Sequence, residues 1–551
     1  EKEPDWQAYM SSRNFTPLRP GQTSYWQNYS KFMVSFMKAM WGDAATQDTD
    51  WAYHYLPKLD VPTYDVLRMF ELMKQGRINN YFCQGFNPLM AFPDRTKLTE
   101  ALSNLKLLVV MDPLETETAH FWQNHGVHNE VDSASIQTEV LELPTTCFAE
   151  DEGALVNSGR WLQWHWPGAT PPGEARNDTW IMANIFQRVR KLYEDEGGIF
   201  PEPILNLTWN YQDPLSPSPE ELAREMNGRA LRDVPDPANP GATLVAAGKQ
   251  LKNFSQLQDD GSTMCGCWIF SGCWNEDGNN MARRDNSDPG DTGLFLNWSF
   301  SWPLNRRILY NRASADLQGK PWDPDRKLIE WTGEKWEGYD VPDIGLTSKP
   351  GEVMPFIMNP EGTGRLFTRG MMRDGPFPSH MEPFESPLAN VLNPKMRGNP
   401  VSRIFVNDAE ALGTSDEFPF VATSYRLTEH FHYWTKHNKV NASLQPEFFV
   451  EISEELAAEK GIAKGGRVRV WGKRGQVWAK AVVTRRIKPM QCDGKTIHVV
   501  GIPLHWGFMG VAKKGWGPNS LTPFVGDANV ETPEFKAFLV NIEPAAEEPV
   551  A

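Results

Sequence analysis

The stretch from residue 63 to residue 111 constrains the fold of this chain more than any other part of it. Apolar side chains at helical spacing over 66–73 predict a helix, for which Thr63 is the expected cap. A strand over 78–83 and a second helix over 94–105 follow it in the sequence. Because helices and strands alternate in this way, we predict an α/β domain built on a parallel sheet.

The next strand, over 107–111, is apolar at every position. An uninterrupted apolar strand is typical of a parallel sheet that helices cover on both faces. A shorter strand over 140–144 and an amphipathic helix that begins at Asn177 or Asp178 and ends at Gly197 continue the pattern. Ligands of such sheets lie beyond the carboxyl ends of the strands, so the residues just after each strand are candidate binding positions.

The first strand end carries Gln84-Gly85-Phe86-Asn87-Pro88. The glycine would let a ligand approach the backbone, and Pro88 keeps Asn87 in an extended conformation. A plain turn between a strand and a helix explains the same residues, and for this motif alone it is the stronger interpretation.

The second strand end carries Asp112, Thr116 and Thr118. A carboxylate at a strand end can accept two charge-assisted hydrogen bonds from the N–H edge of guanine, and the threonines add hydroxyls. The start of an acidic helix would use the same residue types. Two polar segments at neighbouring ends of one sheet favour ligand binding over that alternative.

From about residue 200 to residue 400 the sequence is rich in proline, glycine, aspartate and tryptophan, with few periodic stretches. A structureless loop of that length is uncommon in a compact protein, so we predict an ordered insertion of short elements packed on the core. The tryptophans expected to anchor it are Trp268, Trp274, Trp298, Trp302, Trp322 and Trp331.

Three cysteines in this insertion, Cys265, Cys267 and Cys273, resemble part of a zinc or iron–sulfur site. No fourth ligand stands at a regular spacing, so the match to a tetrahedral site is poor and buried packing is favoured. A disulfide within the group stays open.

After about residue 401 the pattern changes to short strands separated by turns, which predicts a compact β-barrel. Strands are expected over 449–452, 467–471, 476–484, 496–502 and 537–542, with one helix over 454–459 that ends in Gly461.

The barrel region also carries Arg426, Thr428, His430 and His432. On a strand the two histidines would share one face. Arginine and imidazole donors together suit a pyrophosphate or pterin ligand, whereas a polar barrel rim is the simpler alternative. A His-x-His pair without a cysteine or carboxylate partner is only half of a metal site.

A later group in the barrel consists of His505, Trp506, Gly507, Asn519 and Lys536. Trp506 would offer an aromatic wall, Asn519 an amide for the edge of a heterocycle, and Lys536 a cation for phosphate. Each residue is weak evidence by itself. Their ordered appearance in one barrel predicts a site for a large, flat, anionic ligand.

The composition of the chain argues against several classes of protein. The formal net charge of −15 argues against a nucleic-acid partner, which would favour a basic face. No apolar run reaches the roughly 18–20 residues of a membrane span. The six cysteines are too few for a disulfide framework in a chain of 551 residues. The first residue is Glu1, so we expect an N-terminal portion to be removed or carried elsewhere.

The order and spacing of several segments closely resemble the C-terminal cap of molybdopterin oxidoreductases, and within them the catalytic subunit of respiratory or periplasmic formate dehydrogenases. These segments are 425–432, 473–475, 505–507, 518–523 and 533–536. Within the insertion, 267–270, 281–288 and 302–307 resemble the formate dehydrogenase subgroup in particular.

The resemblance implies a fold of class α/β plus β. Residues 1–199 would be the second part of an α/β molybdopterin-dinucleotide-binding domain, with a parallel dinucleotide-binding sheet. Residues 200–400 would be an irregular, Trp-rich insertion packed on the core. Residues 401–551 would form a double-psi-type β-barrel that closes over two molybdopterin guanine dinucleotides carrying molybdenum or tungsten.

Carried over by position, the resemblance assigns a cofactor contact to each candidate residue. The segment 84–88, through Gln84, Gly85, Asn87 and Pro88, would flank one dinucleotide. Its guanine would be read by Asp112, Thr116 and Thr118. The pterin and phosphate portions would be held by Arg426, Thr428, His430, His432, His505, Trp506, Gly507, Asn519 and Lys536.

The implied activity is the two-electron oxidation of formate to carbon dioxide, or the reverse. The family uses a selenocysteine or cysteine on the metal, followed by a histidine, and a separate arginine. None of the six cysteines here precedes a histidine, so these residues and a 4Fe–4S cluster are expected on the absent N-terminal half. We therefore nominate no catalytic residue and no metal ligand in this chain.

The implied partners are the N-terminal half of the same subunit and an iron–sulfur electron-transfer subunit of anaerobic respiration, while a membrane cytochrome subunit is left open. Periplasmic location follows from the resemblance alone. The alternatives are another molybdopterin oxidoreductase, a non-catalytic scaffold subunit, and a glycan-binding protein.

Overall fold

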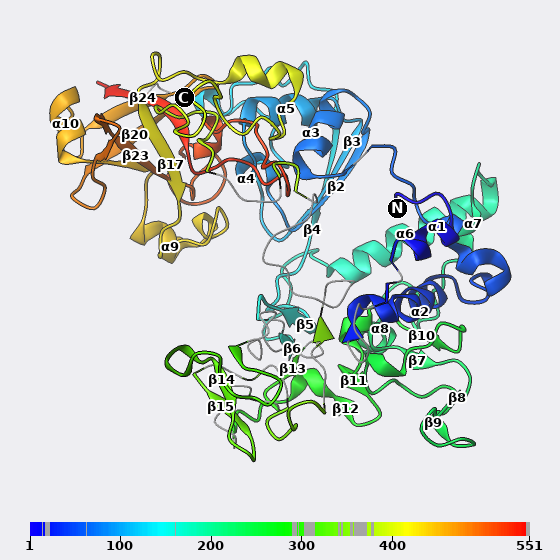
Figure 1. Ribbon diagram of the computed structural model, residues 1–551. Helices are drawn as coiled ribbons and strands as arrows, with labels where there is room; N and C mark the ends of the chain where they lie inside the picture. The colour runs from blue at the N-terminus through cyan, green and yellow to red at the C-terminus, as the bar shows by residue number, and fades with distance from the viewer. Residues whose placement is uncertain are drawn as a thin grey trace. The chain divides into compact units, whose positions relative to one another are not determined.

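The computed structural model describes residues 1–13, 15–16, 23–61, 63–159, 161–288, 295, 297–301, 314–339, 342, 345–352, 356–357, 372–375 and 380–546. The chain forms two compact units (Figure 1). The N-terminal unit comprises Glu1–Pro62 and Thr146–Arg365, and the barrel unit comprises Thr63–Thr145 and Leu366–Ala551. The division into domains 1–199, 200–400 and 401–551 stays a prediction.

A parallel sheet in the order β2-β3-β4 forms one part of the barrel unit. Its strands are β2 (Asn80–Gln84), β3 (Leu107–Asp112) and β4 (Glu139–Pro144). The helices α3 (Val66–Lys74), α4 (Pro88–Ala91) and α5 (Arg95–Ser103) accompany it (Figure 1). The alternation predicted for this stretch is confirmed, and the predicted strand and helix ends agree with the structure within two residues.

The cap of α3 differs from the prediction. Asp65, and not Thr63, is the N-cap, and its carboxylate accepts the backbone N–H of Arg68 at 3.0 Å. The hydroxyl of Thr63 donates to Asp65 at 3.3 Å, and Arg403 forms an ion pair with Asp65 at 3.0 Å. A carboxylate can cap the positive end of the helix and bind the arginine at once, which a threonine cannot.

Helices cover one face of the sheet fully and leave the other face partly open. Leu108 and Val110 are fully buried in the cluster that α3 and α5 form against the sheet. On the opposite face Phe82, Val109 and Leu141 lie side by side, and the outer two are 48% and 43% exposed. The central strand β3 is buried on both faces as expected, since Val109 is 3% exposed, whereas the outer positions on β2 and β4 are open on this face in the described residues.

Six strands close a barrel in the order β17-β23-β18-β20-β19-β24 (Figure 1). They are β17 (Phe420–Tyr425), β18 (Phe449–Ile452), β19 (Arg467–Trp471), β20 (Gln476–Val483), β23 (Val499–Pro503) and β24 (Phe538–Pro544). Alternate residues point inward, so Val468, Val470, Ala479 and Ala481 are fully buried. The predicted barrel is confirmed.

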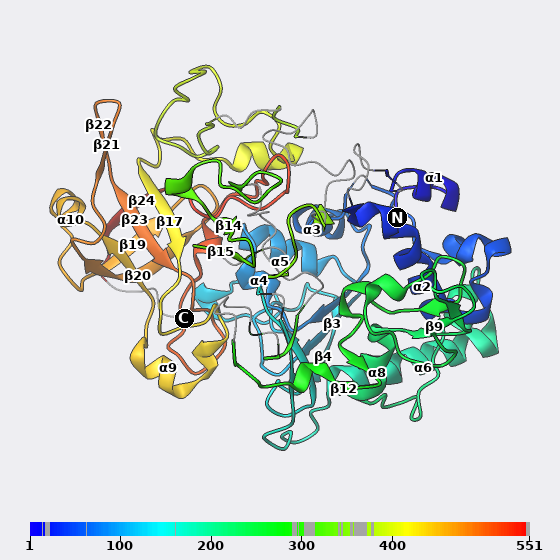
Figure 2. The same ribbon diagram turned by 60° about the horizontal axis from the view of Figure 1, so that its bottom comes forward.

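Within the barrel region, the predicted helix over 454–459 is confirmed and the predicted strand over 496–502 is not. Helix α10 (Glu454–Lys460) begins after Ser453, which accepts the N–H of Leu456 at 3.0 Å, and ends at Gly461 with φ of 66°, as predicted. The single strand predicted over 496–502 is wrong, because β22 (Lys495–Ile497) pairs with β21 (Met490–Cys492) in a hairpin that projects from the barrel (Figure 2).

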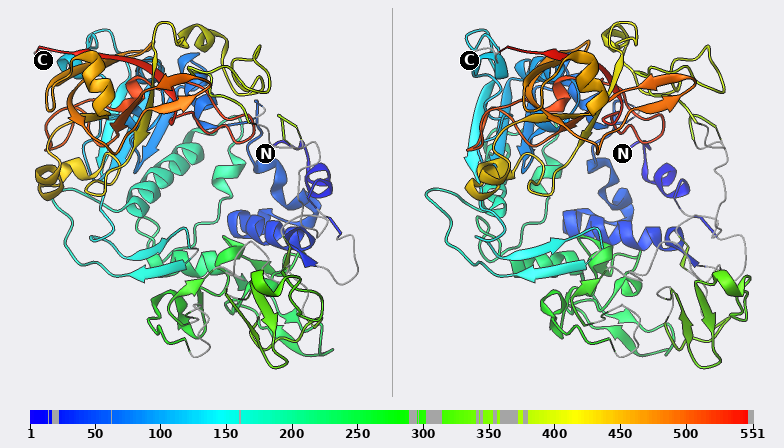
Figure 3. Two further views of the ribbon diagram at one scale, coloured as in Figure 1. Left: turned by 60° about the vertical axis from the view of Figure 1, so that its left-hand side comes forward. Right: turned by 90° about the vertical axis from the view of Figure 1, so that its left-hand side faces the viewer.

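The N-terminal unit contains α2 (Tyr29–Trp41) and the long helix α6 (Asp178–Glu196), both visible in Figure 3. Helix α6 was predicted from the sequence. Asn177 caps α6 by accepting the N–H of Trp180 at 2.7 Å, and Gly197 ends it with φ of 73°. Its other helices are α1 (Trp6–Ser11), α7 (Glu202–Leu205) and α8 (Pro219–Asn227).

The strands β5 (Gly153–Val156), β6 (Trp161–His165) and β13 (Phe300–Ser301) form a sheet in the order β13-β6-β5. The remaining strands of this unit are short and pair mostly in twos. They are β1 (Thr23–Ser24), β7 (Arg229–Ala230), β8 (Val234–Pro235), β9 (Thr243–Val245), β10 (Thr263–Met264), β11 (Trp274–Asn275), β12 (Gly278–Asn279), β14 (Ile329–Trp331), β15 (Trp336–Gly338) and β16 (Phe356–Ile357).

Tryptophans anchor part of the insertion, as expected. Trp268 stacks on Phe32 of α2 with ring centroids 4.3 Å apart. Trp322 is 72% exposed, so its predicted anchoring role is wrong. Trp302 and the segment 302–307 lie outside the described residues. The other predicted anchors lie against aromatic rings or an arginine and are Trp274, Trp298 and Trp331.

The cysteines of the insertion pack as buried thiols. All six cysteines of the chain lie in its described part and are free. Cys265 donates to the carbonyl of Met226 at 3.2 Å, and Cys273 to that of Ala223 at 3.8 Å. Burial raises the pKa of each of these two thiols to about 12. Protonated sulfur bound to carbonyl oxygens matches the packing interpretation, and the disulfide left open by the sequence is not formed.

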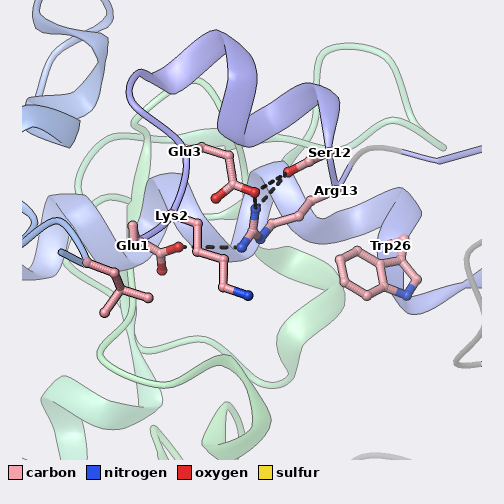
Figure 4. A pocket seen from close by; sticks show the side chains of 7 residues that line it. Glu1, Lys2, Glu3, Ser12, Arg13 and Trp26 are labelled. Atoms are coloured by element: carbon pink, nitrogen blue, oxygen red, sulfur yellow. Dashed lines mark hydrogen bonds and ion pairs between the residues drawn. The ribbon is translucent and has the colours of Figure 1, made fainter. Parts of the chain in front are cut away.

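A pocket of about 450 Å³ lies beside α1 in the N-terminal unit (Figure 4). Arg13 forms ion pairs there with Glu1 at 3.4 Å and Glu3 at 3.1 Å, and Trp26 forms a wall. The two carboxylates satisfy the guanidinium, so Arg13 offers little to a ligand. Within the described part of the chain, every helix falls short of the length and apolar character that a bilayer crossing requires.

Candidate functional site

The strand ends and the barrel loops singled out from the sequence come together in the barrel unit. Tyr433 is 5% exposed, and charged groups from a strand end and from a barrel loop both act on the pKa of its phenol. Burial raises the pKa of its phenol, Glu117 and Asp112 raise it further, and Arg426 acts in the opposite direction. The carboxylate at the end of β3 and the arginine after β17 therefore lie near one side chain.

A buried ion pair joins these parts of the barrel unit. The carboxylate of Glu117 is 0% exposed and pairs with the ammonium of Lys436, which is 1% exposed. Asn87 donates its amide to Glu117 at 2.7 Å, and the backbone N–H of Met509 donates to the same carboxylate at 2.9 Å. Glu117 thus connects both strand ends with the loop after β17 and the loop after β23.

Glu117 and Lys436 were not among the residues selected from the sequence. Glu117 stands between the two threonines that were selected for their hydroxyls, and Lys436 follows the His-x-His pair. Neither residue type suggested burial, because lysine and glutamate are rarely buried unless they are paired. The sequence gives no sign of their contact, because the two residues are 319 positions apart.

Two predicted cofactor contacts are engaged with protein groups. Thr118 donates its hydroxyl to Asn87 at 2.9 Å and accepts the N–H of Leu89 at 3.1 Å. Both side chains are almost fully buried, so in this structure they hold the two strand ends together. A cofactor contact by either one remains a prediction.

The other strand-end residues differ in exposure. Asp112 is 3% exposed and accepts the N–H of Leu114 at 2.9 Å, whereas Gln84 is exposed. Gly85 has φ of 57°, which favours glycine, and its N–H donates to the carbonyl of Met111 at 2.8 Å. The remaining two, Pro88 and Thr116, are buried, Pro88 as the first residue of α4 and Thr116 in the turn that follows Asp112.

The predicted strand position of the His-x-His pair is wrong. β17 ends at Tyr425, and His430 and His432 lie in the following loop. His432 has φ of 46°, a left-handed conformation that no strand contains. His430 is buried and stacks on His505 with ring centroids 5.3 Å apart, while His432 is half-buried. The two imidazoles therefore do not share a strand face.

His505 is a neutral, fully buried imidazole. Its Nε2 accepts the N–H of Leu427 at 2.8 Å, and its Nδ1 donates to the carbonyl of His432. Burial lowers its pKa to about 4, and nearby His430 and Arg426 contribute in the same direction. The ring pins the loop after β17 to the loop after β23.

Acid should therefore destabilise the barrel unit through His505. Its pKa is about 4 in the folded chain against 6.5 ordinarily, so between these values the unfolded chain binds a proton that the folded chain does not. Stability is complete above about pH 6.5 and falls as the pH drops toward 4. We expect this residue to account for ~3 kcal/mol of that loss, measured by denaturant unfolding across the interval.

The variant His505→Gln should show a shallower dependence of unfolding free energy on pH. His380→Gln is the matched control, because the His380 side chain is 66% exposed in the same unit. Equal slopes in both variants and the parent would contradict a buried neutral imidazole at position 505.

Three further predicted residues lie inside the barrel unit. Trp506 is 0% exposed and packs in the barrel core against Phe448 and Phe449. Asn519 donates its amide to the carbonyl of Met90 at 2.9 Å. Gly507 lies against the buried ion pair. A Cβ added to it would lie 2.0 Å from Oε1 of Glu117 and 2.7 Å from Nζ of Lys436. Ligand contacts for these three stay predictions.

The exposed part of the site is positively charged. Arg426 and Thr428 are exposed, and Arg426 has no hydrogen bond or ion pair with any residue that the structure describes. Lys536 donates to the carbonyl of Ser424 at 2.5 Å. Burial and the charge of Arg426 lower the pKa of both Lys536 and His432. Arg426 and Lys536 form no ion pair with a carboxylate of the described residues, so these two cations suit an anionic ligand.

No group of three histidine, cysteine, aspartate or glutamate side chains in the described ranges is arranged to hold a metal ion. The candidate site instead contains an arginine, a lysine, an imidazole and a strand-end carboxylate. They are Arg426, Lys536, His432 and Asp112. Such a set can hold phosphate groups and a hydrogen-bonding heterocycle.

Comparison with known proteins identifies a family for this arrangement. The "Molydopterin dinucleotide binding domain" family matches residues 420–539, which span the barrel. The chain is 58% identical to the "Formate dehydrogenase-O major subunit" of Escherichia coli (strain K12), over 98% of the chain and 53% of that protein. It is 55% identical to the "Formate dehydrogenase, nitrate-inducible, major subunit" of the same organism, over 99% of the chain and 54% of that protein.

The "Formate dehydrogenase major subunit" of Haemophilus influenzae is 46% identical over 99% of the chain and 53% of its own length. Among solved structures, the "Acetylene Hydratase from Pelobacter acetylenicus" is 12% identical with a TM-score of 0.44, over 96% of this chain and 51% of that one, and a likeness this weak carries no weight. The chain spans about half the length of the curated relatives that it matches. The chain is a homologue of the C-terminal part of formate dehydrogenase major subunits and belongs to the molybdopterin oxidoreductase family.

Proposed function

We propose that this chain is the cofactor-holding part of a formate dehydrogenase that converts formate to carbon dioxide, or the reverse. The reaction removes two electrons and one proton from formate. The observation that carries the proposal is the group formed by two cations, Arg426 and Lys536, and the imidazole of His432 on a barrel whose residues 420–539 match a molybdopterin dinucleotide binding family. The family match leaves the glycan-binding alternative without support.

We infer that the cofactor is a pair of molybdopterin guanine dinucleotides with molybdenum or tungsten, and the match of residues 420–539 to a molybdopterin dinucleotide binding family supports this inference. Arg426 and Lys536, with Thr428 and His432, would hold phosphate and pterin oxygen atoms through charge-assisted hydrogen bonds. Asp112, held in place by its bond to the N–H of Leu114, would accept the N–H edge of guanine. When bound, such a cofactor supplies two-electron redox chemistry.

The buried residues would position this set and would not themselves donate to the cofactor. Glu117 and Lys436 hold the strand ends against the barrel loops, and His505 fixes the course of the loop that carries Arg426. Because His505 stays neutral near pH 7, it adds no charge beside the cations. Anchored donors need little reorganisation when an anion binds, which favours affinity.

The finer description of the fold belongs to the same proposal. We infer that the sheet is part of a dinucleotide-binding domain and that the barrel is of the double-psi type. In support, β17 is parallel to β23 and β18 is parallel to β20, while the other strand pairs of the closed barrel are antiparallel.

The partners of the proposed enzyme lie outside the residues described. The metal-binding selenocysteine or cysteine, its histidine and arginine, and a 4Fe–4S cluster would belong to an N-terminal half, in keeping with the length of the relatives. An iron–sulfur subunit, a membrane cytochrome subunit and periplasmic location complete the proposal. Metal analysis of the complete subunit, with activity measured on formate, nitrate and sulfoxides, tests it, and activity on nitrate without formate oxidation would overturn it.

Removing the Arg426 cation should weaken cofactor retention. A charged hydrogen bond contributes about 1.5–3 kcal/mol, so we expect Arg426→Ala to lower cofactor affinity roughly 10- to 100-fold. Guanine nucleotide released per polypeptide on heating the complete enzyme measures retention.

Arg485→Ala is the matched control for this variant. The side chain of Arg485 is 84% exposed and pairs only with exposed Glu454 among the described residues, so its loss should leave retention unchanged. Equal guanine nucleotide content in the two variants would contradict the role proposed for Arg426.

A further inference from the structure

A second basic group lies in the barrel unit, away from Arg426. This basic cluster consists of Arg95 at the start of α5, His125 and His128 between β3 and β4, and Lys513 and Lys514 in the loop after β23. None of these residues was selected from the sequence. They come together because two aromatic residues of that loop pack against the segment between β3 and β4.

Phe508 and Trp516 provide the frame of the basic cluster. The guanidinium of Arg95 lies 5.9 Å from the centroid of the Phe508 ring, and the His125 ring stacks on the same ring at 4.7 Å. Arg95 also donates through Nη2 to the carbonyl of His128 at 2.5 Å, while the His128 ring lies 4.2 Å from that of Trp516. Phe508 and Trp516 are each 2% exposed, so the frame is rigid.

Three polar atoms of the basic cluster are shielded from solvent and lack a hydrogen-bond partner among the described residues. They are Nη1 of Arg95, Nε2 of His125 and Nδ1 of His128. His128 is only 5% exposed. Buried polar atoms are almost always satisfied in folded proteins, so three together around one aromatic frame indicate a bound group.

The charge around these atoms is positive. Burial lowers the pKa of His128 to about 4, and Arg95, Lys514, His125 and Lys513 lower it further. No carboxylate appears among the groups that act on His128.

Three carboxylates lie at the margin of the basic cluster, and one of them, Glu447, forms an ion pair with Lys513 at 3.5 Å. Glu117, which acts on Arg95 and His125, already pairs with Lys436. Glu142 lies 3.6 Å from His120. None of the three is among the groups that act on His128, so the surroundings of its ring suit an anion.

We propose that the basic cluster binds a small oxyanion, a phosphate or a carboxylate group. Arg95 and His128 donate to its oxygen atoms, and exposed Lys514 supplies further positive charge. Guanidinium and imidazole donors around a single anion are a recurring arrangement for such groups. The oxyanion has two sources, a phosphate of the bound dinucleotide or a free anion such as formate. The inference does not depend on the proposed oxidation of formate.

Titrating the chain with inorganic phosphate, and separately with sodium formate, tests the proposal. Calorimetry gives the affinity, and NMR of ¹³C-labelled histidines follows His128. We expect saturable binding and a rise of about one unit in the pKa of His128, because a nearby anion favours the charged imidazole. Acetamide, which is neutral, should not bind. No saturable binding of either anion would overturn the proposal and leave ordered water as the satisfying group.

Variants of the basic cluster sharpen the test. Arg95→Gln should weaken phosphate binding at least tenfold, and Lys514→Ala about threefold, because Lys514 contributes charge without a fixed contact. Lys514 is exposed, so its variant keeps the fold even if Arg95→Gln does not. Lys464→Ala, another exposed lysine of the barrel unit, is the matched control. Equal affinity in Lys514→Ala, Lys464→Ala and the parent would also overturn the proposal.

Loading the complete enzyme with its cofactor separates the two sources. If phosphate binding at the basic cluster is lost on loading, the occupant is a dinucleotide phosphate. If it persists, the site takes a free anion. An enzyme that fails to oxidise formate would sink the proposed function while leaving the phosphate affinity of the chain intact, so the two failures are distinguishable.

Discussion

Replacing Lys436 with methionine is expected to lower the free energy of unfolding of the barrel unit by about 3–5 kcal/mol. The substitution removes the cation of an ion pair whose side chains are 1% and 0% exposed, and so leaves the Glu117 carboxylate buried without compensation. Burial alone would raise the pKa of Glu117, but the charge and hydrogen bond of Lys436 and the bonds from Met509 and Asn87 lower it overall. Denaturant unfolding monitored by tryptophan fluorescence measures the loss.

The loss should depend on pH in a defined direction. Without Lys436, burial raises the pKa of Glu117 above its ordinary value of 4.5, so protonation of the carboxylate accompanies folding. Stability that depends on such a proton is present at low pH and is lost as the pH rises. We therefore expect the deficit of Lys436→Met to be larger near pH 8 than near pH 5.

Two further variants separate the buried pair from ordinary ion pairs. Lys480→Met removes the cation of a pair with Glu447 whose side chains are 45% and 25% exposed, and should cost about 1 kcal/mol or less. The double variant Glu117→Gln with Lys436→Met removes both charges and should recover much of the lost stability. A deficit for Lys436→Met that matches Lys480→Met at every pH would show that the pair is not buried as described.

The second large effect is expected for Gly507→Ala. A methyl group at this position would lie 2.0 Å from Oε1 of Glu117 and 2.7 Å from Nζ of Lys436, both well inside contact distance. Both atoms belong to an ion pair whose side chains are 0% and 1% exposed, so we expect the backbone of the loop after β23 to move. We expect a destabilisation of about 3 kcal/mol, at the upper end for overpacked positions.

The loop displaced by Gly507→Ala also carries His505, which fixes the loop of Arg426 through the N–H of Leu427. Cofactor content of the complete enzyme should therefore fall together with the unfolding free energy. Gly168→Ala is the matched control, because its added Cβ would meet the carbonyl of Ala149 at an ordinary 3.7 Å. Gly507→Ala with the stability and cofactor content of the control would contradict the packing described around Glu117.

Elements of the fold that depend on neighbouring residues could be predicted from the sequence. Helix α10 and its end at Gly461 follow from a cap residue, helical spacing and a glycine with positive φ, all within a few positions. The strands β18 and β19 follow from period-two alternation between turn residues. The cap of α3 was assigned to the wrong residue because the choice of Asp65 depends on Arg403, which is remote in sequence.

The sequence indicated which residue types belong to the candidate site, but it did not indicate which of their side chains are buried. Trp506 was expected to face a ligand, and it lies in the barrel core. His430 and His432 were expected on one strand face, and they lie in a loop where one is buried and the other half-buried. Spacing along the chain does not say where a strand stops pairing, and that point decides which way the next residues turn.

The sequence by itself determined the class of the fold, the family and the set of polar residues from which a site could be built, because these depend on local patterns and on identity with relatives. Only the tertiary structure decided which of those residues are anchors and which are open to a ligand. Closing the barrel against the strand ends buries Glu117 with Lys436, residues 319 positions apart, and leaves Arg426 exposed. A charge is tolerated in the interior only beside its partner, and that partnership exists in three dimensions and not along the chain.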